Sequence, residues 1–397
     1  MRWSWFMPYH FFIKRREERE KREERERAFY ENGSVLLEKL IASCNAKPIP
    51  IRTFSAQQLF QATNNFSSEL RGDFWSYWYK GSLEGRIVLI NRLHYTFLAD
   101  FAINDLVISA QMSSHSNVLK PIGCCLYTPS PFLVFEFAAN GFLADRIYVS
   151  HVTELQHQPM VWERRLKIAR QIAHALSFLH TAFPRPVIHM GIRMHTILLD
   201  ENDVPKLSSF YFSVSIPEGE ADVEGYDGIR QFGLCAPEFK ATGKVTEKAD
   251  VYDFGRILLE LLTGEDSYNK TRFTIDKDST LVAYIHNRAQ GSCINEIVDP
   301  AILAEDGDGG ATLQHQLQAV VDLALTCTEE DPQTRPTMVD VTKQLRFTQT
   351  SEVLLGNLQN LKLHESFEEH ASASLKRNAS SDEIQAVNEA SERPLEV

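Results

Sequence analysis

The stretch from His189 to Thr196 gathers side chains of the kinds that carry out acid–base and phosphoryl chemistry. It reads His189-Met190-Gly191-Ile192-Arg193-Met194-His195-Thr196. The run offers imidazole, guanidinium and hydroxyl groups, but it contains no carboxylate. His195 is a candidate general base, although geometry comes before pKa in choosing a base. We expect His195 to face outward from the loop, which argues against that role.

Metal-ligand spacings are not evident in the sequence. Of the six cysteines, Cys124 and Cys125 are adjacent and the others are scattered, which is typical of buried thiols in a reducing compartment. The stretch Ser208-Ser209-Phe210 supplies hydroxyl groups, which are poor ligands for a hard divalent cation. We therefore predict no bound metal.

Composition and charge narrow the class of protein. The 397 residues are 43% apolar and 24% charged, which is typical of a globular chain with a sizeable core. The formal net charge of −12 argues against nucleic-acid binding. The sequence shows no apolar run near the roughly 20 residues that a membrane-spanning helix needs. We expect a cytoplasmic protein, with peripheral attachment at the plasma membrane as the alternative.

The order of the predicted elements indicates an α+β fold with two lobes. Short β-rich runs, such as 86–90 and 132–135, fill the region from 79 to 137, and one helical stretch near 102–112 interrupts them. Long amphipathic helices follow at 162–180, 248–263, 312–327 and 338–345. Strands first and helices afterwards predict a small β-rich lobe over 54–137 and a larger helical lobe over 138–348.

Residues 1–50 form a predicted helical extension. An aromatic stretch over 3–13 leads into a basic cluster and a charged segment, and a second helix is predicted at 35–42. Acid-first pairs four residues apart, such as Glu17 and Lys21, favour a solvated helix. The alternative is an aromatic and basic foot on an anionic membrane surface.

Two boundaries set off the lobes. Residues 47–50, Lys-Pro-Ile-Pro, interrupt regular structure before the first lobe. Residues 364–397 are rich in Ser, Glu and Ala with few large apolar side chains, so we predict a disordered acidic tail there.

Six segments stand in a fixed order along the chain: Tyr79-Lys80-Gly81, Leu133-Val134-Phe135-Glu136-Phe137, Asn140-Gly141, Ala236-Pro237-Glu238, Asp250-Val251-Tyr252-Asp253-Phe254-Gly255 and Asp331-Pro332-Gln333-Thr334-Arg335-Pro336. Together they resemble the plant receptor-like and receptor-like cytoplasmic protein kinases. The resemblance covers the region from Phe54 to Leu345 and implies the two-lobed protein kinase fold.

A second set of segments lies mostly near the N-terminus: Phe29-Tyr30-Glu31-Asn32-Gly33-Ser34, Leu40-Ile41-Ala42-Ser43-Cys44, Pro50-Ile51-Arg52-Thr53-Phe54-Ser55, Gln111-Met112-Ser113-Ser114-His115 and Gly123-Cys124-Cys125. These are similar to the ZRK-type (ZED-like) pseudokinases of plants. That resemblance implies pairing with a coiled-coil NLR immune receptor and engagement of receptor-like cytoplasmic kinases. We expect receptor contacts on the N-terminal block before Pro48 and on the outer face of the strand lobe.

The loop that would cover the phosphates of ATP is altered relative to the kinases. Its three glycine positions hold Arg71, Asp73 and Ser76, although glycine is needed there for a close backbone approach. Bulky aromatic residues surround these positions. We interpret the loop as a hairpin turn packed shut by aromatic rings.

The strand lysine that holds the phosphates is also missing. Its position is Asn91, and Asp105 is the helix acid that would lack its lysine partner. Arg92 follows Asn91, but alternation along a strand points it to the opposite face.

The catalytic base and the magnesium ligands are altered as well. The base aspartate corresponds to Gly191, the metal-binding asparagine to Thr196 and the magnesium-binding aspartate to Ser209. Loss of a positioned general base alone removes about 3–5 kcal/mol of barrier stabilisation. Ordinary phosphoryl transfer is therefore not expected.

Scaffold residues of the kinase fold are retained. The resemblance implies that His189 and Phe210 belong to a hydrophobic spine between the lobes, and that Asp250 receives backbone N–H groups of the catalytic loop. It also implies that Glu238 and Arg335 form an ion pair buried in the helical lobe.

Fold residues are kept where chemistry residues are lost, so we interpret the chain as a pseudokinase rather than an enzyme. The resemblance implies an adaptor or decoy in plant immune signalling, which bridges an NLR receptor and receptor-like cytoplasmic kinases. The alternative hypothesis is an atypical active serine/threonine kinase or an ATP-sensing switch at the plasma membrane. It would need Arg92, Arg193 or His195 to rebuild the site. No cofactor is predicted, and the altered positions argue against ATP binding.

Overall fold

The computed structural model describes residues 6–43, 51–70, 76–148, 159–224, 235–267, 280–289, 294–304 and 310–348. The chain divides into two compact units, Met1–Leu345 and Arg346–Val397, and the first unit holds both lobes. Four predictions fall wholly or partly outside the described residues: the aromatic stretch over 3–13, the boundary at 47–50, the loop positions Arg71 and Asp73, and the disordered tail over 364–397.

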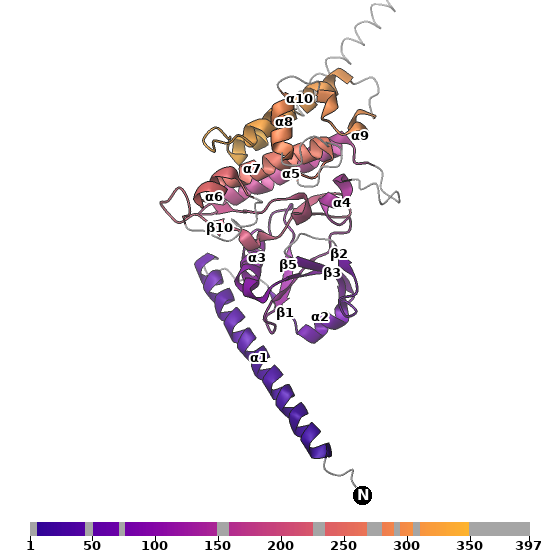
Figure 1. The fold of residues 1–397 in the computed structure, drawn as a ribbon, viewed down its shortest axis with the longest axis vertical. Helices are drawn as coiled ribbons and strands as arrows, with labels where there is room; N and C mark the ends of the chain where they lie inside the picture. Colours follow the sequence, from indigo (N-terminus) through magenta and orange to yellow (C-terminus); the bar gives the residue numbers. More distant parts are fainter. Residues whose placement is uncertain are drawn as a thin grey trace, which may run out of the picture. The chain divides into compact units, whose positions relative to one another are not determined.

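The N-terminal lobe is built on a six-stranded sheet (Figure 1). The strand order is β1-β5-β6-β4-β3-β2, and every neighbouring pair is antiparallel except β1 with β5. The strands are β1 Arg52–Thr53, β2 Glu69–Leu70, β3 Ser76–Leu83, β4 Arg86–Leu93, β5 Pro121–Cys125 and β6 Phe132–Glu136. The β-rich runs predicted at 86–90 and 132–135 thus become the central strands β4 and β6.

Three α-helices accompany this sheet: α1 Phe6–Ser43, α2 Ala56–Ala62 and α3 Ala99–Gln111, the last preceded by the 3₁₀ turn η1 Thr96–Leu98. Helix α2 starts at Ser55, whose hydroxyl accepts the Gln58 N–H at 3.2 Å while the Gln58 side chain accepts the Ser55 N–H at 2.8 Å. This reciprocal capping satisfies two N–H groups that the helix start would leave open. Helix α3 contains the stretch predicted near 102–112.

Helix α1 is unbroken, so the prediction of a separate second helix over 35–42 is wrong. Asn32 is buried against the strand lobe, where its Nδ2 donates to the carbonyls of Leu126 and Thr128, each at 3.0 Å. The chain therefore stays helical through Gly33, where local propensity alone would favour an interruption. Figure 1 shows α1 running from beside α3 away from the lobe.

The ion pairs on α1 also differ from the predicted ones. The structure pairs Arg16 with Glu20, Arg19 with Glu23 and Arg22 with Glu26 at 2.8, 3.5 and 3.9 Å, with the base first in each case. All six side chains are exposed. Exposed pairs of this kind contribute little to stability, so the ion pairs over residues 16–26 add little to the stability of α1.

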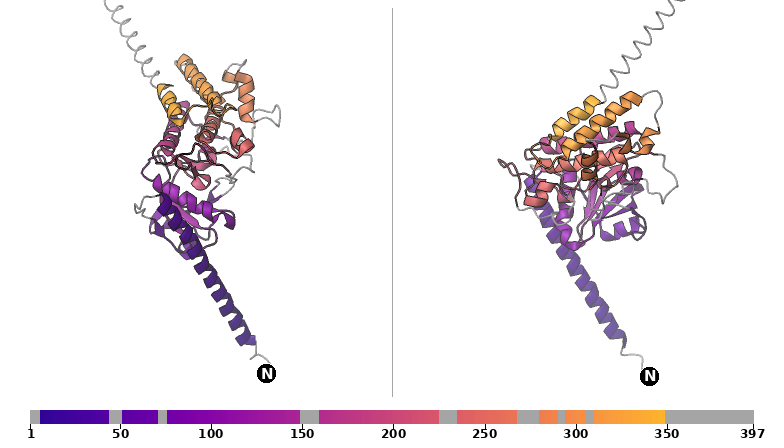
Figure 2. Two further views of the ribbon diagram at one scale, coloured as in Figure 1. Left: turned by 90° about the vertical axis from the view of Figure 1, so that its left-hand side faces the viewer. Right: turned by 45° about the horizontal axis from the view of Figure 1, so that its top comes forward.

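The C-terminal lobe consists mainly of helices. They are α4 Leu143–Ile147, α5 Trp162–Thr181, α6 Pro237–Thr242, α7 Glu247–Thr263, α8 Leu281–Ala289, α9 Pro300–Leu303 and α10 Gly310–Cys327, and a further helix begins at residue 338. The 3₁₀ turns are η2 Met194–Thr196, η3 Phe210–Phe212 and η5 Ile294–Glu296. In the left-hand view of Figure 2 the orange helices lie at the top and the purple strand lobe lies below them.

Two short strand pairs lie in the C-terminal lobe and bracket the loops of interest. β7 Val187–Ile188 pairs with β10 Val214–Ser215, and β8 Ile197–Leu199 pairs with β9 Pro205–Leu207. In the first pair, β7 ends just before His189 and β10 begins just after η3. In the second pair, β8 follows η2 directly and β9 ends just before Ser208. Together they fix the backbone on both sides of the predicted catalytic and metal positions.

Arg335 and Glu238 form a bidentate ion pair in the helical lobe. Both guanidinium-to-carboxylate distances are 2.8 Å, and Arg335 is fully buried. The guanidinium also lies over the Tyr252 ring, 5.0 Å from its centroid, and donates to three backbone carbonyls. The sequence resemblance implied this pairing.

We predict that Glu238→Gln lowers the free energy of unfolding by about 3–5 kcal/mol, because it leaves the buried Arg335 charge without its counter-ion. Denaturant unfolding of the full chain measures this change. The matched control is Glu224→Gln, since Glu224 forms an exposed ion pair with Lys244 at 2.5 Å, and this variant should unfold like the wild type. Equal effects of the two substitutions would contradict the prediction.

Candidate functional site

The face of β3 and β4 that turns toward the helical lobe carries Trp78 and Asn91. These two residues lie directly opposite each other in the strand pairing, so their side chains share one face of the sheet. Both are buried, and Asn91 Nδ2 donates to the Tyr77 carbonyl at 3.4 Å. In a protein kinase the lysine at the Asn91 position holds ATP phosphates, so we call this side of the strands the nucleotide face.

The indole of Trp78 occupies the nucleotide face. Its ring centroid lies 5.7 Å from that of Phe135 on β6 and 6.0 Å from that of Phe142, which immediately precedes α4. All three rings are almost completely buried. The indole Nε1 donates to the Ser76 hydroxyl at 3.0 Å. Ser76 stands where a kinase phosphate loop has its last glycine, and here its side chain supports the indole. Trp78 therefore bridges the strand lobe and the start of the helical lobe.

Sequence reasoning anticipated bulky rings around the phosphate loop but did not single out Trp78. The available signal was positional, because Trp78 is two residues beyond the last glycine position, Ser76, and so points to the same face as that residue. The pairing register with Asn91 was the missing piece of information. It depends on the length of the β3–β4 turn, which the sequence pattern left open.

Asp105 is bound to the backbone that follows the predicted metal position. Its Oδ1 accepts the Phe210 N–H at 3.0 Å and the Ser109 hydroxyl at 3.1 Å, and the side chain is buried. The lysine expected as its partner in an active kinase is replaced by Asn91, but the carboxylate has other hydrogen-bond partners. Because no lysine stands at Asn91, the carboxylate of α3 is held by a main-chain donor on the adjoining segment rather than by an ion pair with β4.

Asp250 organises the catalytic-loop backbone from the first turn of α7. One carboxylate oxygen accepts the His189 N–H at 2.8 Å and lies 2.8 Å from His180 Nε2, and the other accepts the Met190 N–H at 2.9 Å. Met190 has a φ of 62°, which is unfavourable for a residue with a side chain. These hydrogen bonds hold Met190 in its strained conformation. The next residue, Gly191, stands at the position of the catalytic base.

Gly191 and Thr196 contribute no carboxylate or amide to the site. A Cβ at Gly191 would meet no atom closer than 3.9 Å, so the fold has room for a side chain there. The Thr196 hydroxyl lies 3.2 Å from the Gly191 carbonyl and 3.0 Å from that of Arg193. It also accepts the Arg193 N–H at 3.0 Å. The Thr196 side chain thus bonds to backbone groups of its own loop.

Ser209 adopts the left-handed conformation with a φ of 66°. The neighbouring Ser208 hydroxyl donates to the Thr196 carbonyl at 2.8 Å and lies 3.4 Å from the Ser209 hydroxyl. The two positions that would supply magnesium ligands, Thr196 and Ser209, therefore come together but offer only hydroxyls. Across the described residues, no cluster of three or more His, Cys, Asp or Glu side chains could hold a metal ion.

The rings of His189 and Phe210 pack against each other at a tilt of 45°, with their centroids 4.7 Å apart. His189 Nε2 lies 3.2 Å from the Ser208 carbonyl, and the ring is fully buried. Burial lowers the pKa of His189 to about 4, although the nearby Asp250 carboxylate acts to raise that pKa. The imidazole is therefore neutral near pH 7 and serves the packing between the catalytic loop and η3.

Two of the three residues considered as substitutes for missing groups, Arg92 and His195, lie away from the positions they would have to replace. Arg92 lies over the Phe132 ring at 5.2 Å, on the other face of β4 from Asn91, as alternation along the strand predicts. His195 is half-buried, with its ring centroid 5.8 Å from that of Tyr148. It is thus less outward-facing than expected.

The two lobes and the geometry of the loops define a protein-kinase-like domain. In agreement, the profile of the protein tyrosine and serine/threonine kinase family matches residues 99–345. The chain is 37% identical to the serine/threonine-protein kinase ZRK1 of Arabidopsis thaliana over 84% of this chain and 95% of that protein. It is 40% identical to the Arabidopsis non-functional pseudokinase ZED1 over 79% of this chain and 94% of that protein. It is 37% identical to the Arabidopsis non-functional pseudokinase ZRK2 over 85% of this chain and 94% of that protein.

The chain therefore belongs to the ZRK/ZED1 family of protein kinases and pseudokinases. The resemblance found in the sequence and the two-lobed kinase fold are confirmed. As for membrane insertion, none of the helices in the described part of the chain has the length and apolar character needed to span a bilayer.

The lowered pKa of His189 predicts how stability depends on pH. The unfolded chain protonates this imidazole below about pH 6.5 and the folded chain only below about pH 4. The contribution to stability is thus complete above pH 6.5 and is lost as the pH falls toward 4, by about 3 kcal/mol in total. His189→Gln, which keeps a donor for Ser208, should remove this component.

Denaturant unfolding between pH 4 and 7 gives the free energy of unfolding at each pH. The effect is the difference between wild type and variant in the slope of that free energy against pH. His315→Gln, which replaces an exposed imidazole on α10, controls for the loss of a histidine. An unchanged slope in His189→Gln would be incompatible with a neutral, buried His189.

Proposed function

We propose that this chain is a catalytically impaired kinase-like protein that acts as an adaptor or decoy in plant immune signalling. In this role it bridges a coiled-coil NLR receptor and receptor-like cytoplasmic kinases. The observation that carries the catalytic part of the proposal is Trp78, whose buried indole lies on the nucleotide face opposite Asn91. A nucleotide would have to displace this ring from Phe135 and Phe142.

The chemistry of the loops supports the same conclusion. Phosphoryl transfer depends almost entirely on positioning and electrostatic stabilisation by a base, a lysine and metal ligands. Gly191, Thr196 and Ser209 offer neither a carboxylate for the base nor a ligand set for magnesium. The names of ZED1 and ZRK2, both non-functional pseudokinases, fit this proposal.

The outward face of α1 supports a role in binding a protein partner. Tyr30, Leu37 and Ile41 are 73%, 59% and 70% exposed, and their spacing of seven and four residues places them along one side of the helix. Grouped exposed apolar side chains mark interaction sites more often than scattered ones. Phe97 and Tyr95, 75% and 46% exposed, add a stacked aromatic pair on the strand lobe.

The segment 218–224, which we call the acidic segment, supports contact with a second partner. Glu218, Glu220 and Glu224 are exposed, and Lys244 is the basic side chain paired with this segment, at its end. Complementary potentials increase association rates and orient partners. A basic surface on a receptor-like cytoplasmic kinase would meet this requirement.

A second candidate function is an atypical serine/threonine kinase, which the name of ZRK1 favours. It requires new groups to replace the lysine and the base. Arg92 lies on the face of β4 opposite Asn91, and His195 is half-buried beside Tyr148. Neither placement favours this alternative.

The receptor interaction is tested by co-purification of the full chain with a coiled-coil NLR of the source plant. We predict that Leu37→Asp with Ile41→Asp weakens binding by roughly tenfold or more, because charges replace apolar side chains at the centre of the contact. Val161→Asp, which alters an exposed apolar residue of the helical lobe, should bind like the wild type. Binding that survives the Leu37/Ile41 variant combined with Phe97→Asp would overturn the receptor assignment.

A further inference from the structure

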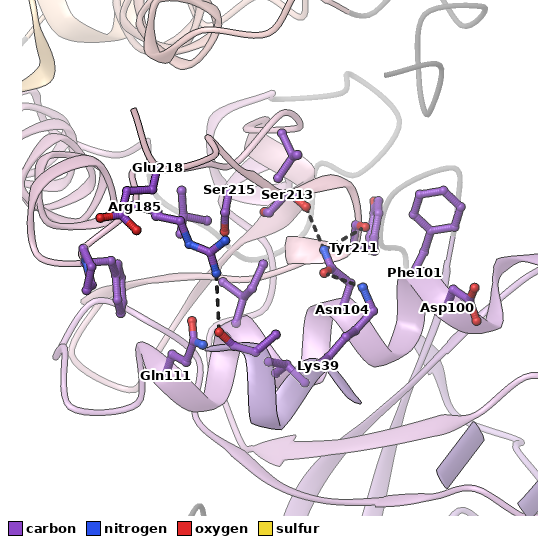
Figure 3. Close-up of a pocket in the computed structure, with 17 residues that line it drawn as sticks. Lys39, Asp100, Phe101, Asn104, Gln111, Arg185, Tyr211, Ser213, Ser215 and Glu218 are labelled. Atoms are coloured by element: carbon purple, nitrogen blue, oxygen red, sulfur yellow. Dashed lines mark hydrogen bonds between the residues drawn. The ribbon is translucent and has the colours of Figure 1, made fainter. Parts of the chain in front are cut away.

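Asn104 stands where the N-terminal helix, α3 and the segment after Ser209 meet (Figure 3). On one side, its Oδ1 accepts a hydrogen bond from Lys39 Nζ of α1 at 3.2 Å. On the other side, its Nδ2 faces the carbonyls of Phe210, Tyr211 and Ser213 at 3.2, 3.4 and 2.8 Å. A single side chain of α3 therefore contacts both α1 and the backbone of residues 209–213, which we call the 209–213 turn.

A cavity of about 670 Å³ lies around this junction. Lys39, Asn104, Tyr211 and Ser213 line it, as do Ala42 at the end of α1 and Arg185 ahead of β7 (Figure 3). Across the cavity, Arg185 donates to the Ala42 carbonyl at 3.4 Å. A hollow region forfeits the dispersion contacts that dense packing would supply. The two polar links instead tie the end of α1 to Asn104 of α3 and to Arg185 ahead of β7.

Neighbouring residues of α3 hold the turn from two directions. Asp105 accepts the Phe210 N–H, and Asn104 donates to the Phe210 carbonyl. In a kinase the acid of this helix would pair with the strand lysine and so respond to the nucleotide site. With Asn91 in that position, the main-chain groups of the turn take over the anchoring of α3, and α1 is connected to them through Lys39.

We propose that Asn104 is a positioning residue that couples the docking of α1 to the order of the 209–213 turn. When a partner draws the end of α1 away, Lys39 leaves Asn104, the turn opens more often, and the acidic segment that follows it becomes freer to move. The device replaces nucleotide binding as the input to this part of the fold. The coupling between α1 and the turn is built into the chain, whichever partner acts on α1, and does not depend on the adaptor function proposed above.

Hydrogen–deuterium exchange on the full chain measures opening of the turn directly, because protected amides exchange through local opening. The informative amides are those of Phe210 and Ser213, which donate to Asp105 and to the Phe210 carbonyl. Lys39→Ala should speed their exchange about fivefold, the change expected for the loss of one net hydrogen bond. Exchange in α7 should stay at the wild-type rate.

The matched control is Lys21→Ala, since Lys21 is an exposed lysine on the same helix. It should leave exchange in the turn unchanged. Because Asn32 still bonds to Leu126 and Thr128, Lys39→Ala keeps the middle of α1 docked and does not put folding at risk.

A second variant separates coupling from docking. Asn104→Asp keeps an acceptor for Lys39 but turns a carboxylate oxygen toward the carbonyls of the turn, so exchange at Phe210 and Ser213 should rise while exchange in α1 does not. Two results would overturn the proposal. One is that the amides of the turn exchange at the same rate in Lys39→Ala as in the control Lys21→Ala. The other is faster exchange in α7 to the same extent as in the turn, which indicates general destabilisation.

Discussion

Protein interiors are packed about as densely as organic crystals, and the space between two kinase-like lobes is subject to the same constraint. In this chain the indole of Trp78 meets that constraint, because it packs against Phe135 of the strand lobe and Phe142 at the entrance to the helical lobe. The ring is fully buried, and Ser76 satisfies its N–H. The lobes are thereby joined by the protein's own side chain. On this face the buried indole lies opposite Asn91, the position that holds the phosphate-binding lysine in active kinases.

The loops keep their shape because main-chain hydrogen bonds, rather than catalytic side chains, hold them. Asp250 binds the N–H groups of His189 and Met190, Thr196 binds the loop that contains Gly191, and Asp105 binds the Phe210 N–H. None of these contacts requires a metal or a phosphate. The kinase-like backbone of these loops is therefore maintained with Gly191 at the base position and Ser209 at the metal position. The neutral, buried His189 adds packing to the same arrangement.

Much of the fold could be predicted from the sequence, because strong periodicity identified the central strands and the long helices, and motif order indicated two lobes. The contacts that give the site its character could not. Helix α1 stays continuous where Asn32 donates to two carbonyls almost a hundred residues away. The local helix propensity around Gly33 gives no indication of these contacts. The pairing of Trp78 with Asn91 depends on strand register, and the bond from Asp105 to Phe210 joins residues 105 positions apart. Residue types showed which chemical groups were missing, whereas only three-dimensional placement showed which groups replaced them.

The central claim is that the nucleotide face is closed by the protein itself. A thermal-shift titration of the full chain with ATP, with and without magnesium, tests it most directly, with an active protein kinase titrated alongside as a positive control. A nucleotide that binds only the folded state would add about 2.7 kcal/mol of stability at roughly 100 times its Kd. The account predicts no change in Tm at saturating ATP under either condition. A magnesium-dependent rise in Tm would contradict it, because nucleotide and metal would then be bound where Trp78, Thr196 and Ser209 now stand.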